Sequence, residues 1–353
     1  MQPVTLFQSM MPAFARRFNA RWLGYACDQE ASRMDFDTRL GTAWNEHADD
    51  PAAVAARLPE LAALVGTEAQ WIALANLVHH VQAQHLGAWE PARAALDALA
   101  GHPAYVDAGP SGQARRRWGA ALALSAGTAP ATALAGLAPS DRVRALAMAA
   151  ANRAENCRAP DAAGAAALWS AALDEAGRSG LPATDPLHRT LAATGNGIAC
   201  VMEERASRSA AERDLMLSAA QAARTHWALA GTWLEVERAE YRLAMSWLQA
   251  GDPARAAAHA QACLDGIAGH DGPAFERFFG WEAMARARIA SGSADAVVAR
   301  AAIDNARTAF AALAPDDRAS CAASLDALDS AFAAASGTVA APAAAAADGP
   351  RMA

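Results

Sequence analysis

The sequence contains no lysine, and all 30 of its basic residues are arginine. This absence excludes a Schiff-base lysine, a phosphate-loop lysine and a lysine general base, and with them much covalent and nucleotide chemistry. The 37 acidic residues outnumber the arginines and give a formal net charge of -7. A surface built for nucleic-acid phosphates needs a net basic footprint, so we expect no nucleic-acid partner.

β-Branched apolar residues are also scarce, with five Ile and 12 Val in 353 residues, whereas alanine makes up more than a quarter of the chain. This composition favours helices and disfavours sheets. The length exceeds that of one average domain, which leaves a large single domain, several small domains or a repeat array. We therefore expect an all-α protein.

Cysteines are few and scattered, without the paired spacing of a zinc site or a disulfide framework. They are Cys27, Cys157, Cys200, Cys263 and Cys321. The sequence also lacks an uncharged apolar stretch of about 18 residues and the pattern of a secretory leader. We expect a cytoplasmic protein in a reducing compartment, with no membrane span.

The two ends of the chain differ from the rest. Apolar residues between Leu6 and Trp22 recur at steps of three and four, which predicts an amphipathic helix. This helix is expected to pack on the next helices, and the alternative is that it docks a partner or a membrane surface. Residues 336–353 alternate small residues with Pro and Gly, which predicts a disordered tail.

Between these ends the sequence falls into helical stretches separated by Gly, Pro, Asp and Ser. We expect N-terminal capping helices in residues 1–66, helical repeats in 67–335 and the tail in 336–353. The expected helix starts lie near Asp35, Pro51, Thr67, Trp89, Ser111, Pro139, Asp161, Asp185, Ser209, Thr232, Asp252, Gly272, Ala294 and Pro315.

One pattern recurs along the chain. The stretch RLAMSWLQAGDPARAAAHAQACL, residues 242–264, has a Leu243-Ala244 pair and Trp247, then a turn at Gly251 and small residues at steps of four and three. Similar stretches surround turns near residues 87, 127, 160, 206 and 292, on average 41 residues apart. Alanine allows two helix backbones to approach closely, and the ten Trp residues, spread along the chain, fill the remaining gaps.

These residues resemble the tetratricopeptide repeat (TPR) family, whose unit is a helix-turn-helix hairpin. The resemblance implies a right-handed α-solenoid of antiparallel hairpins with a concave groove. The spacing of 41 residues departs from the family's 34, and the closing proline is mostly missing. Helical repeats of a longer type therefore remain an alternative.

The resemblance also implies a site, because the first helix of each TPR hairpin lines the groove. Asn196 occupies the place of an asparagine that holds a bound peptide's backbone in some TPR proteins. The expected groove residues are Asn196, Glu203, Glu204, Arg238, Tyr241, Met245, Gln249, Glu282 and Arg286. They predict a non-enzymatic scaffold or adaptor that binds a protein or peptide.

Three alternatives remain open. The same positions can form an ordinary polar helix surface, or the repeats can belong to a regulator that responds to a small molecule or a signal peptide. The third is an enzyme that uses Glu203, Glu204, His226 or Glu240 as acid-base groups. No catalytic residues are assigned, because nucleophile elbow, kinase and dinucleotide motifs are missing.

We also expect neither a metal nor another cofactor. His79, His80 and His85 lie in one expected helix, but neither His79 nor His80 is followed four residues later by a histidine or a carboxylate. His259 and Cys263 are four residues apart, yet two ligands do not make a site. The two glycines of TGNG, residues 194–197, are interpreted as a tight helix crossing and not as a phosphate cradle.

Overall fold

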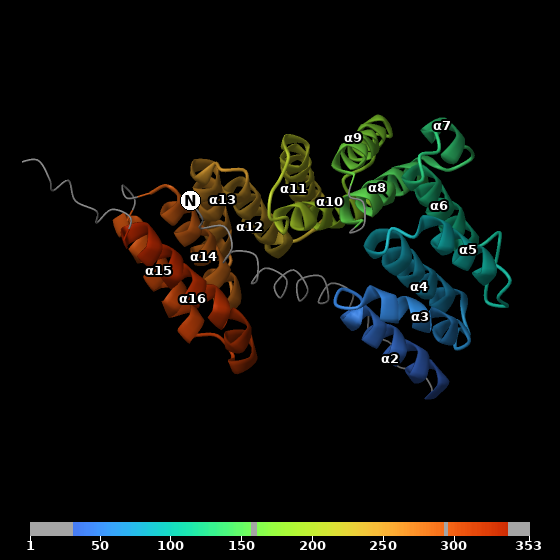
Figure 1. Ribbon diagram of the computed structural model, residues 1–353, viewed down its shortest axis with the longest axis horizontal. Coiled ribbons are helices and arrows are strands. Elements are labelled where there is room, and N and C mark those ends of the chain that lie inside the picture. The colour runs from blue at the N-terminus through green and yellow to red at the C-terminus, as the bar shows by residue number, and fades with distance from the viewer. Residues whose placement is uncertain (1–30, 157–160, 293–295, 338–353) are drawn as a thin grey trace, which may run out of the picture. The chain divides into compact units, whose positions relative to one another are not determined.

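The structure is a computed structural model that describes residues 31–156, 161–292 and 296–337. The expected amphipathic helix at the N-terminus lies outside these residues, as do the tail beyond residue 337, Cys27, Cys157 and the turn near residue 160. The described residues form helices joined by turns, without a strand (Figure 1). Within them, no helix is both long and apolar enough to span a membrane.

The described part contains fifteen α-helices and one π-helical segment, η1. Their bounds are α2 Ala31–Glu46, α3 Pro51–Ala62, α4 Glu68–Val78, η1 His79–His85, α5 Trp89–Leu99, α6 Pro110–Ser125, α7 Pro130–Ala133, α8 Pro139–Glu155, α9 Ala162–Arg178, α10 Leu187–Glu203, α11 Ala210–Ala230, α12 Trp233–Gln249, α13 Pro253–Gly269, α14 Ala274–Ala290, α15 Ala296–Ala311 and α16 Pro315–Gly337.

Local sequence signals set most helix starts. The expected starts at Pro51, Trp89, Pro139 and Pro315 are the first residues of their helices. Other starts carry an N-cap whose side chain accepts a hydrogen bond from a backbone N–H of the first turn. These N-caps are Asp50, Thr67, Asp161, Ser209 and Asp252. The expected helix starts are confirmed at these positions.

Several expected turns are confirmed by the backbone. Gly87, Gly127, Gly251 and Gly292 have φ angles of 58°, 94°, 81° and 91°. This left-handed conformation is available to glycine without a steric penalty, and it reverses the chain after a helix. The turn near residue 206 separates α10 from α11.

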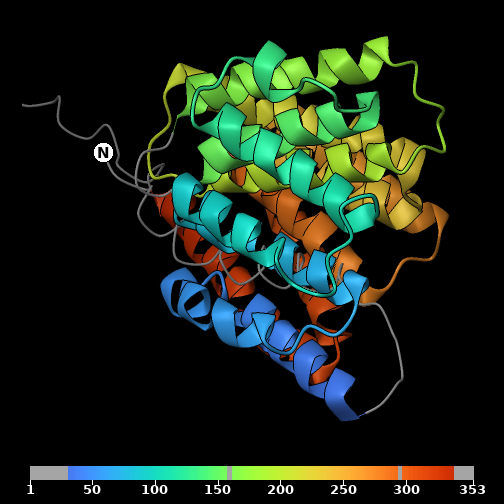
Figure 2. The same ribbon diagram turned by 90° about the vertical axis from the view of Figure 1, so that its right-hand side faces the viewer.

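The chain divides into two compact units, with the division between Ser246 and Trp247 inside α12. In the first unit, α8 packs on α6, α9 and α10, while α11 packs on both α9 and α10. The helices α6, α8 and α10 thus form one layer, the inner layer, and α9 and α11 form the outer layer (Figures 1 and 2). In the second unit, α14 packs on α13, α15 and α16.

The first helices of the chain share one apolar core, which extends from Phe36 to Leu122. Trp71 lies fully buried in it and donates its indole N–H to the carbonyl of Leu99 at 2.8 Å. Residue 66, the expected boundary between the capping helices and the repeats, lies between α3 and α4.

Small residues permit close helix crossings. A Cβ added at Gly195 in α10 would lie 2.6 Å from the carbonyl oxygen of Ala219 in α11 and 3.1 Å from the ring of Trp169. The backbone of α11 cannot move away cheaply from such a contact. The interpretation of the TGNG stretch as a tight helix crossing is therefore confirmed at Gly195.

Candidate functional site

Buried polar side chains occur on alternate helices of the described part of the chain. In the described part of the chain they lie on α4, η1, α6, α8, α10, α12 and α14, or at the C-cap of α8. The buried side chains of α9, α11, α13 and α15 are apolar. The buried polar residues are Gln70, His79, Ser111, Ser125, Asn152, Asn156, His188, Asn196, Glu203, Glu237, Glu240, Arg242, Ser246, Glu276, Glu282 and Arg286.

A buried ion pair joins α10 to α12 in the first unit. The guanidinium of Arg242 donates to Oε2 of Glu203, and Ser246 donates its hydroxyl to Oε1 of the same carboxylate at 2.5 Å. The side chains of Arg242 and Glu203 are only 3% and 1% exposed. Because moving two charges out of water is costly, this pair is a weak source of stability but a strong constraint on helix register.

Burial and neighbouring charges shift the pKa values of this cluster in opposing ways, and they leave the nearby thiol neutral. Burial raises the pKa of Glu203, and the guanidinium of Arg242 and the hydroxyl of Ser246 oppose this rise. Burial lowers the pKa of Arg242, and the neighbouring Cys200 and Glu203 more than reverse this effect. Burial also raises the pKa of Cys200 to about 12, so this cysteine is not a thiolate nucleophile.

Two further carboxylates lie near this cluster. Burial raises the pKa of Glu155 to about 7, with a further contribution from the negative charge of Glu204. Glu155 ends α8, and Glu204 follows directly after α10. Sequence reasoning missed Glu155, because only the packing of α8 on α10 brings it near a second carboxylate.

The expected groove residues of the first unit lie on α10, directly after it, or on α12. Their side chains differ in solvent exposure. Asn196 is buried and its amide donates to the sulfur of Cys200 at 3.8 Å. Cys200 lies one turn before Glu203 in α10. Tyr241 and Met245 are buried in α12. Arg238 is half-buried and Glu204 is exposed.

The remaining expected groove residues belong to the second unit. Glu282 and Arg286 lie one turn apart on α14, where the Nη2 of Arg286 donates to Oε1 of Glu282 at 2.6 Å. Both side chains are buried. Gln249 is half-buried at the end of α12. The structure therefore brings Glu282 and Arg286 together as a pair of their own.

The residues considered as acid-base groups already have partners. Both oxygens of Glu203 accept hydrogen bonds from Arg242 and Ser246. Glu240 accepts a hydrogen bond from Arg224 at 2.7 Å. The Nδ1 atoms of His226 and His188 are 2.9 Å apart. These side chains serve helix packing in this structure.

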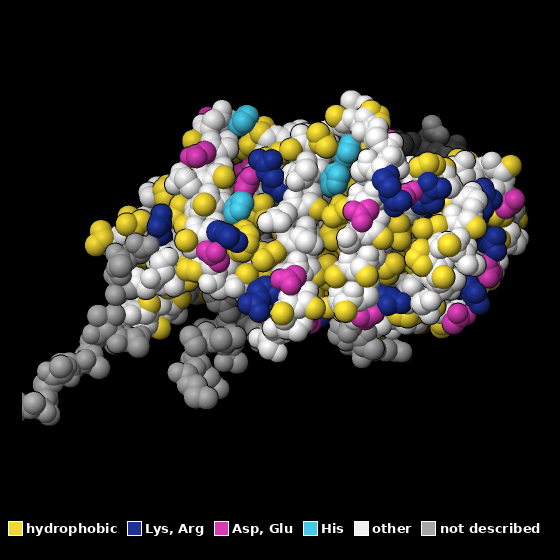
Figure 3. Space-filling model, turned by 90° about the horizontal axis from the view of Figure 1, so that it is seen from above, with side chains coloured by type: hydrophobic (Ala, Val, Ile, Leu, Met, Phe, Trp, Pro, Cys, Tyr) yellow, Lys and Arg dark blue, Asp and Glu magenta, His cyan; other side chains and the backbone are white. Residues whose placement is uncertain are grey.

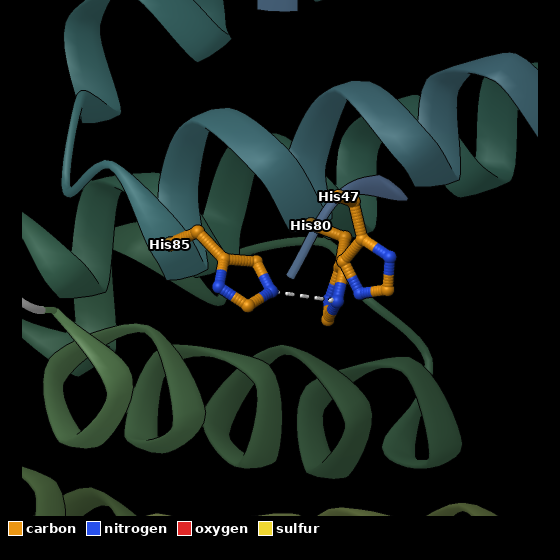
Figure 4. Close-up of side chains that lie close together, drawn as sticks. All are labelled: His47, His80 and His85. Atoms are coloured by element: carbon orange, nitrogen blue, oxygen red, sulfur yellow. Dashed lines mark hydrogen bonds between the residues drawn. The ribbon is translucent and has the colours of Figure 1, made fainter. Parts of the chain in front are cut away.

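A second cluster consists of His47, His80 and His85 (Figure 4), and we call it the histidine cluster. One ring nitrogen from each residue lies within 4.8 Å of the other two, and the Nε2 atoms of His80 and His85 are 3.1 Å apart. His47 follows α2, whereas the other two lie in η1. His79 contacts the amide of Asn152 instead, at 3.3 Å.

The π-helical geometry of η1 creates this cluster. A π-helix closes its hydrogen bonds over five residues, so His80 and His85 meet on one face. The sequence argument against a metal site used α-helical spacing, which does not apply to η1. It also could not include His47, which is 33 positions away from His80 in the sequence.

The three imidazoles are held neutral. Burial lowers the pKa of His47, and it lowers the pKa of His85 to about 4 with a contribution from His47. The pKa of His80 lies well below its ordinary value because of burial and the two neighbouring rings. Neutral imidazoles carry the lone pairs that a metal ligand requires.

Compared with known proteins, the chain matches no family model and no curated sequence.

Proposed function

We propose that the chain is a non-enzymatic, TPR-like scaffold of the cytoplasm that binds a protein or peptide partner along the inner layer. In the first unit, the proposed surface consists of α8 and α10 of the inner layer together with the part of α12 up to Ser246, which the Glu203–Arg242 pair joins to α10. The observation that carries the proposal is that polar side chains are buried on this layer, whereas the outer helices bury only apolar ones. Buried polar groups cost folding free energy but fix how these helices align, and this alignment positions Glu204 and Arg238 at the surface to recognise a partner.

The chemistry of this region suits a polar peptide. The half-buried Arg238 and the exposed Glu204 place one positive and one negative side chain in this region, which also contains the buried Tyr241 and Met245. Figure 3, which views the molecule from above Figure 1, shows arginine and acidic side chains interspersed with apolar ones on that face. The partner's backbone and charged side chains would then supply most of the specificity.

The proposal is tested with substitutions at the surface of this region. Tyr241 is 4% exposed, so its truncation would damage the core and would not report on binding. Glu204→Ala and Arg238→Ala leave the apolar core intact. Affinity purification of the full chain from the native extract, quantified by mass spectrometry, should yield a partner that both variants lose.

The control is Arg213→Ala on the exposed face of α11, in the outer layer. It removes the same charge as Arg238→Ala and should retain the partner. Calorimetry with the purified partner then measures direct binding, where each inner-layer variant should weaken affinity at least about tenfold. Equal capture by all variants, or capture that only Arg213→Ala abolishes, would refute the assignment to the inner layer.

A further inference from the structure

We propose that His47, His80 and His85 form a binding site for a transition-metal ion, with Zn²⁺ as the preferred occupant. Three neutral nitrogen ligands converge from two separate segments of the chain (Figure 4). The ring centroids of His47 lie 4.8 Å from His80 and 5.1 Å from His85, and those of His80 and His85 are 4.7 Å apart. Each ring therefore lies next to the other two.

The separation of the nitrogens fits a tetrahedral ion. With Zn–N bonds of about 2.0–2.1 Å and tetrahedral angles, two ligand nitrogens lie about 3.3 Å apart. The Nε2 atoms of His80 and His85 are 3.1 Å apart, close to this value. All three ligand atoms lie within 4.8 Å of one another, so side-chain shifts of about 1 Å complete the set.

In two of the three histidines, the other ring nitrogen has the kind of partner that metal-binding histidines use. Nδ1 of His47 contacts the backbone carbonyl of Trp44, and Nδ1 of His80 contacts the side-chain carbonyl of Gln84. Each oxygen is an acceptor, so each Nδ1 carries the proton and each Nε2 presents its lone pair. Such contacts fix the tautomer and ring orientation of a ligand before the metal binds.

The type of ligand restricts which metal ions the site can bind. Three imidazoles without a carboxylate in the set suit Zn²⁺, Cu²⁺, Ni²⁺ or Co²⁺ and are poor ligands for Mg²⁺ or Ca²⁺. Three protein ligands leave the fourth tetrahedral position for water or for a side chain of a bound partner. The site therefore has the composition of an open zinc site and not that of a closed structural one.

The π-helix is a second, independent indication of function. A full turn of π-helix is rare, and such segments occur frequently at functional sites. If η1 were α-helical, His80 would share a face with Gln84, four residues later, and His85 would point elsewhere. The π-helical turn thus brings the third imidazole to the other two and leaves Gln84 to orient His80.

The experiment uses the full chain, stripped with a chelator and titrated with Zn²⁺ by calorimetry at pH 7. We expect one Zn²⁺ per chain, and a visible absorption spectrum of tetrahedral Co²⁺ when cobalt replaces zinc. His47→Gln and His85→Gln should each weaken Zn²⁺ binding at least about 100-fold, and Gln84→Ala should weaken it about 10-fold to 100-fold.

The matched control is His270→Gln, which removes an exposed histidine of the second unit. Circular dichroism and thermal unfolding of each apo variant show whether the fold is intact, and Zn²⁺ should raise the Tm of the parent and of His270→Gln but not of the cluster variants. Zn²⁺ affinity that is unchanged in folded His47→Gln and His85→Gln would overturn the proposal, as would a parent chain that binds no Zn²⁺ or Co²⁺. The metal experiment measures Zn²⁺ binding and Tm without any partner, so either of the two proposals can fail while the other holds.

Discussion

The helices α10 and α11 follow each other in the chain and pack together, yet they bury different chemistry. The buried side chains of α10 include His188, Asn196 and Glu203, whereas those of α11 are Leu, Met, Ala and Trp. The difference follows from position, because α10 also packs on α8 and is tied to α12 by the Glu203–Arg242 pair. A helix with neighbours on several sides buries its polar positions together with its apolar ones.

This comparison separates stability from specificity. Apolar burial in the outer helix stabilises the fold through area and packing, at about 25 cal/mol for each Å². Polar burial in the inner helix contributes little net free energy, but a mispaired register would leave charges unsatisfied. The outer layer therefore stabilises the packing of the first unit through apolar burial, and the inner layer specifies how its helices align.

The largest expected effect comes from breaking the inner ion pair. Arg242→Met leaves the carboxylate of Glu203 buried without its counterion and should reduce the free energy of unfolding by about 3–5 kcal/mol. The double variant Glu203→Leu/Arg242→Met removes both charges and should recover most of this loss. Denaturant unfolding measures both. If the double variant is as unstable as the single one, lost packing and not the unpaired charge explains the effect.

The corresponding test of the outer layer is Trp169→Ala in α9. Trp169 is 1% exposed and lies against Gly195 of the inner layer. The cavity should cost about 3–4 kcal/mol, towards the lower part of the usual range, because small neighbouring residues let the helices close partly around it. Leu229→Ala, at an exposed position of α11, is the control and should cost less than about 0.5 kcal/mol. Equal effects at both positions would show that α9 does not depend on this contact.

Local signals explain why the helix starts and many turns were predictable. An N-cap such as Asp252 and a left-handed glycine such as Gly251 act on the residues next to them, so the sequence alone carries the information. The all-helical fold follows likewise from abundant alanine and few β-branched residues.

The site chemistry was harder to predict because it depends on packing between distant segments. Glu203 was expected among the groove residues, and no local pattern indicated that it would pair with Arg242, 39 positions later. Glu155 acquires its raised pKa from burial and from Glu204, which no sequence pattern indicates. The histidine cluster needs both a π-helical turn and His47, and neither follows from α-helical periodicity.

The smallest expected effect tests the contact between the two layers. His188 of α10 and His226 of α11 stack with ring centroids 5.1 Å apart, and Nε2 of His188 donates to the carbonyl of Pro182 at 3.1 Å. The Nδ1 of His188 therefore accepts a hydrogen bond from the Nδ1–H of His226. Burial lowers the pKa of His226 to about 4, and the adjacent His188 contributes to this shift.

Acid should therefore weaken this contact. Between pH 6.5 and about 4 the unfolded chain binds a proton at His226 that the folded chain does not, so stability falls as the pH decreases through this window. Allowing for the partial exposure of the ring, the loss between about pH 7 and pH 5 should be about 1 kcal/mol larger in the parent than in His226→Gln. Denaturant unfolding at both pH values measures this difference, and His270→Gln should behave like the parent. The same pH dependence in His226→Gln would mean that burial of His226 does not contribute to the acid sensitivity of the fold.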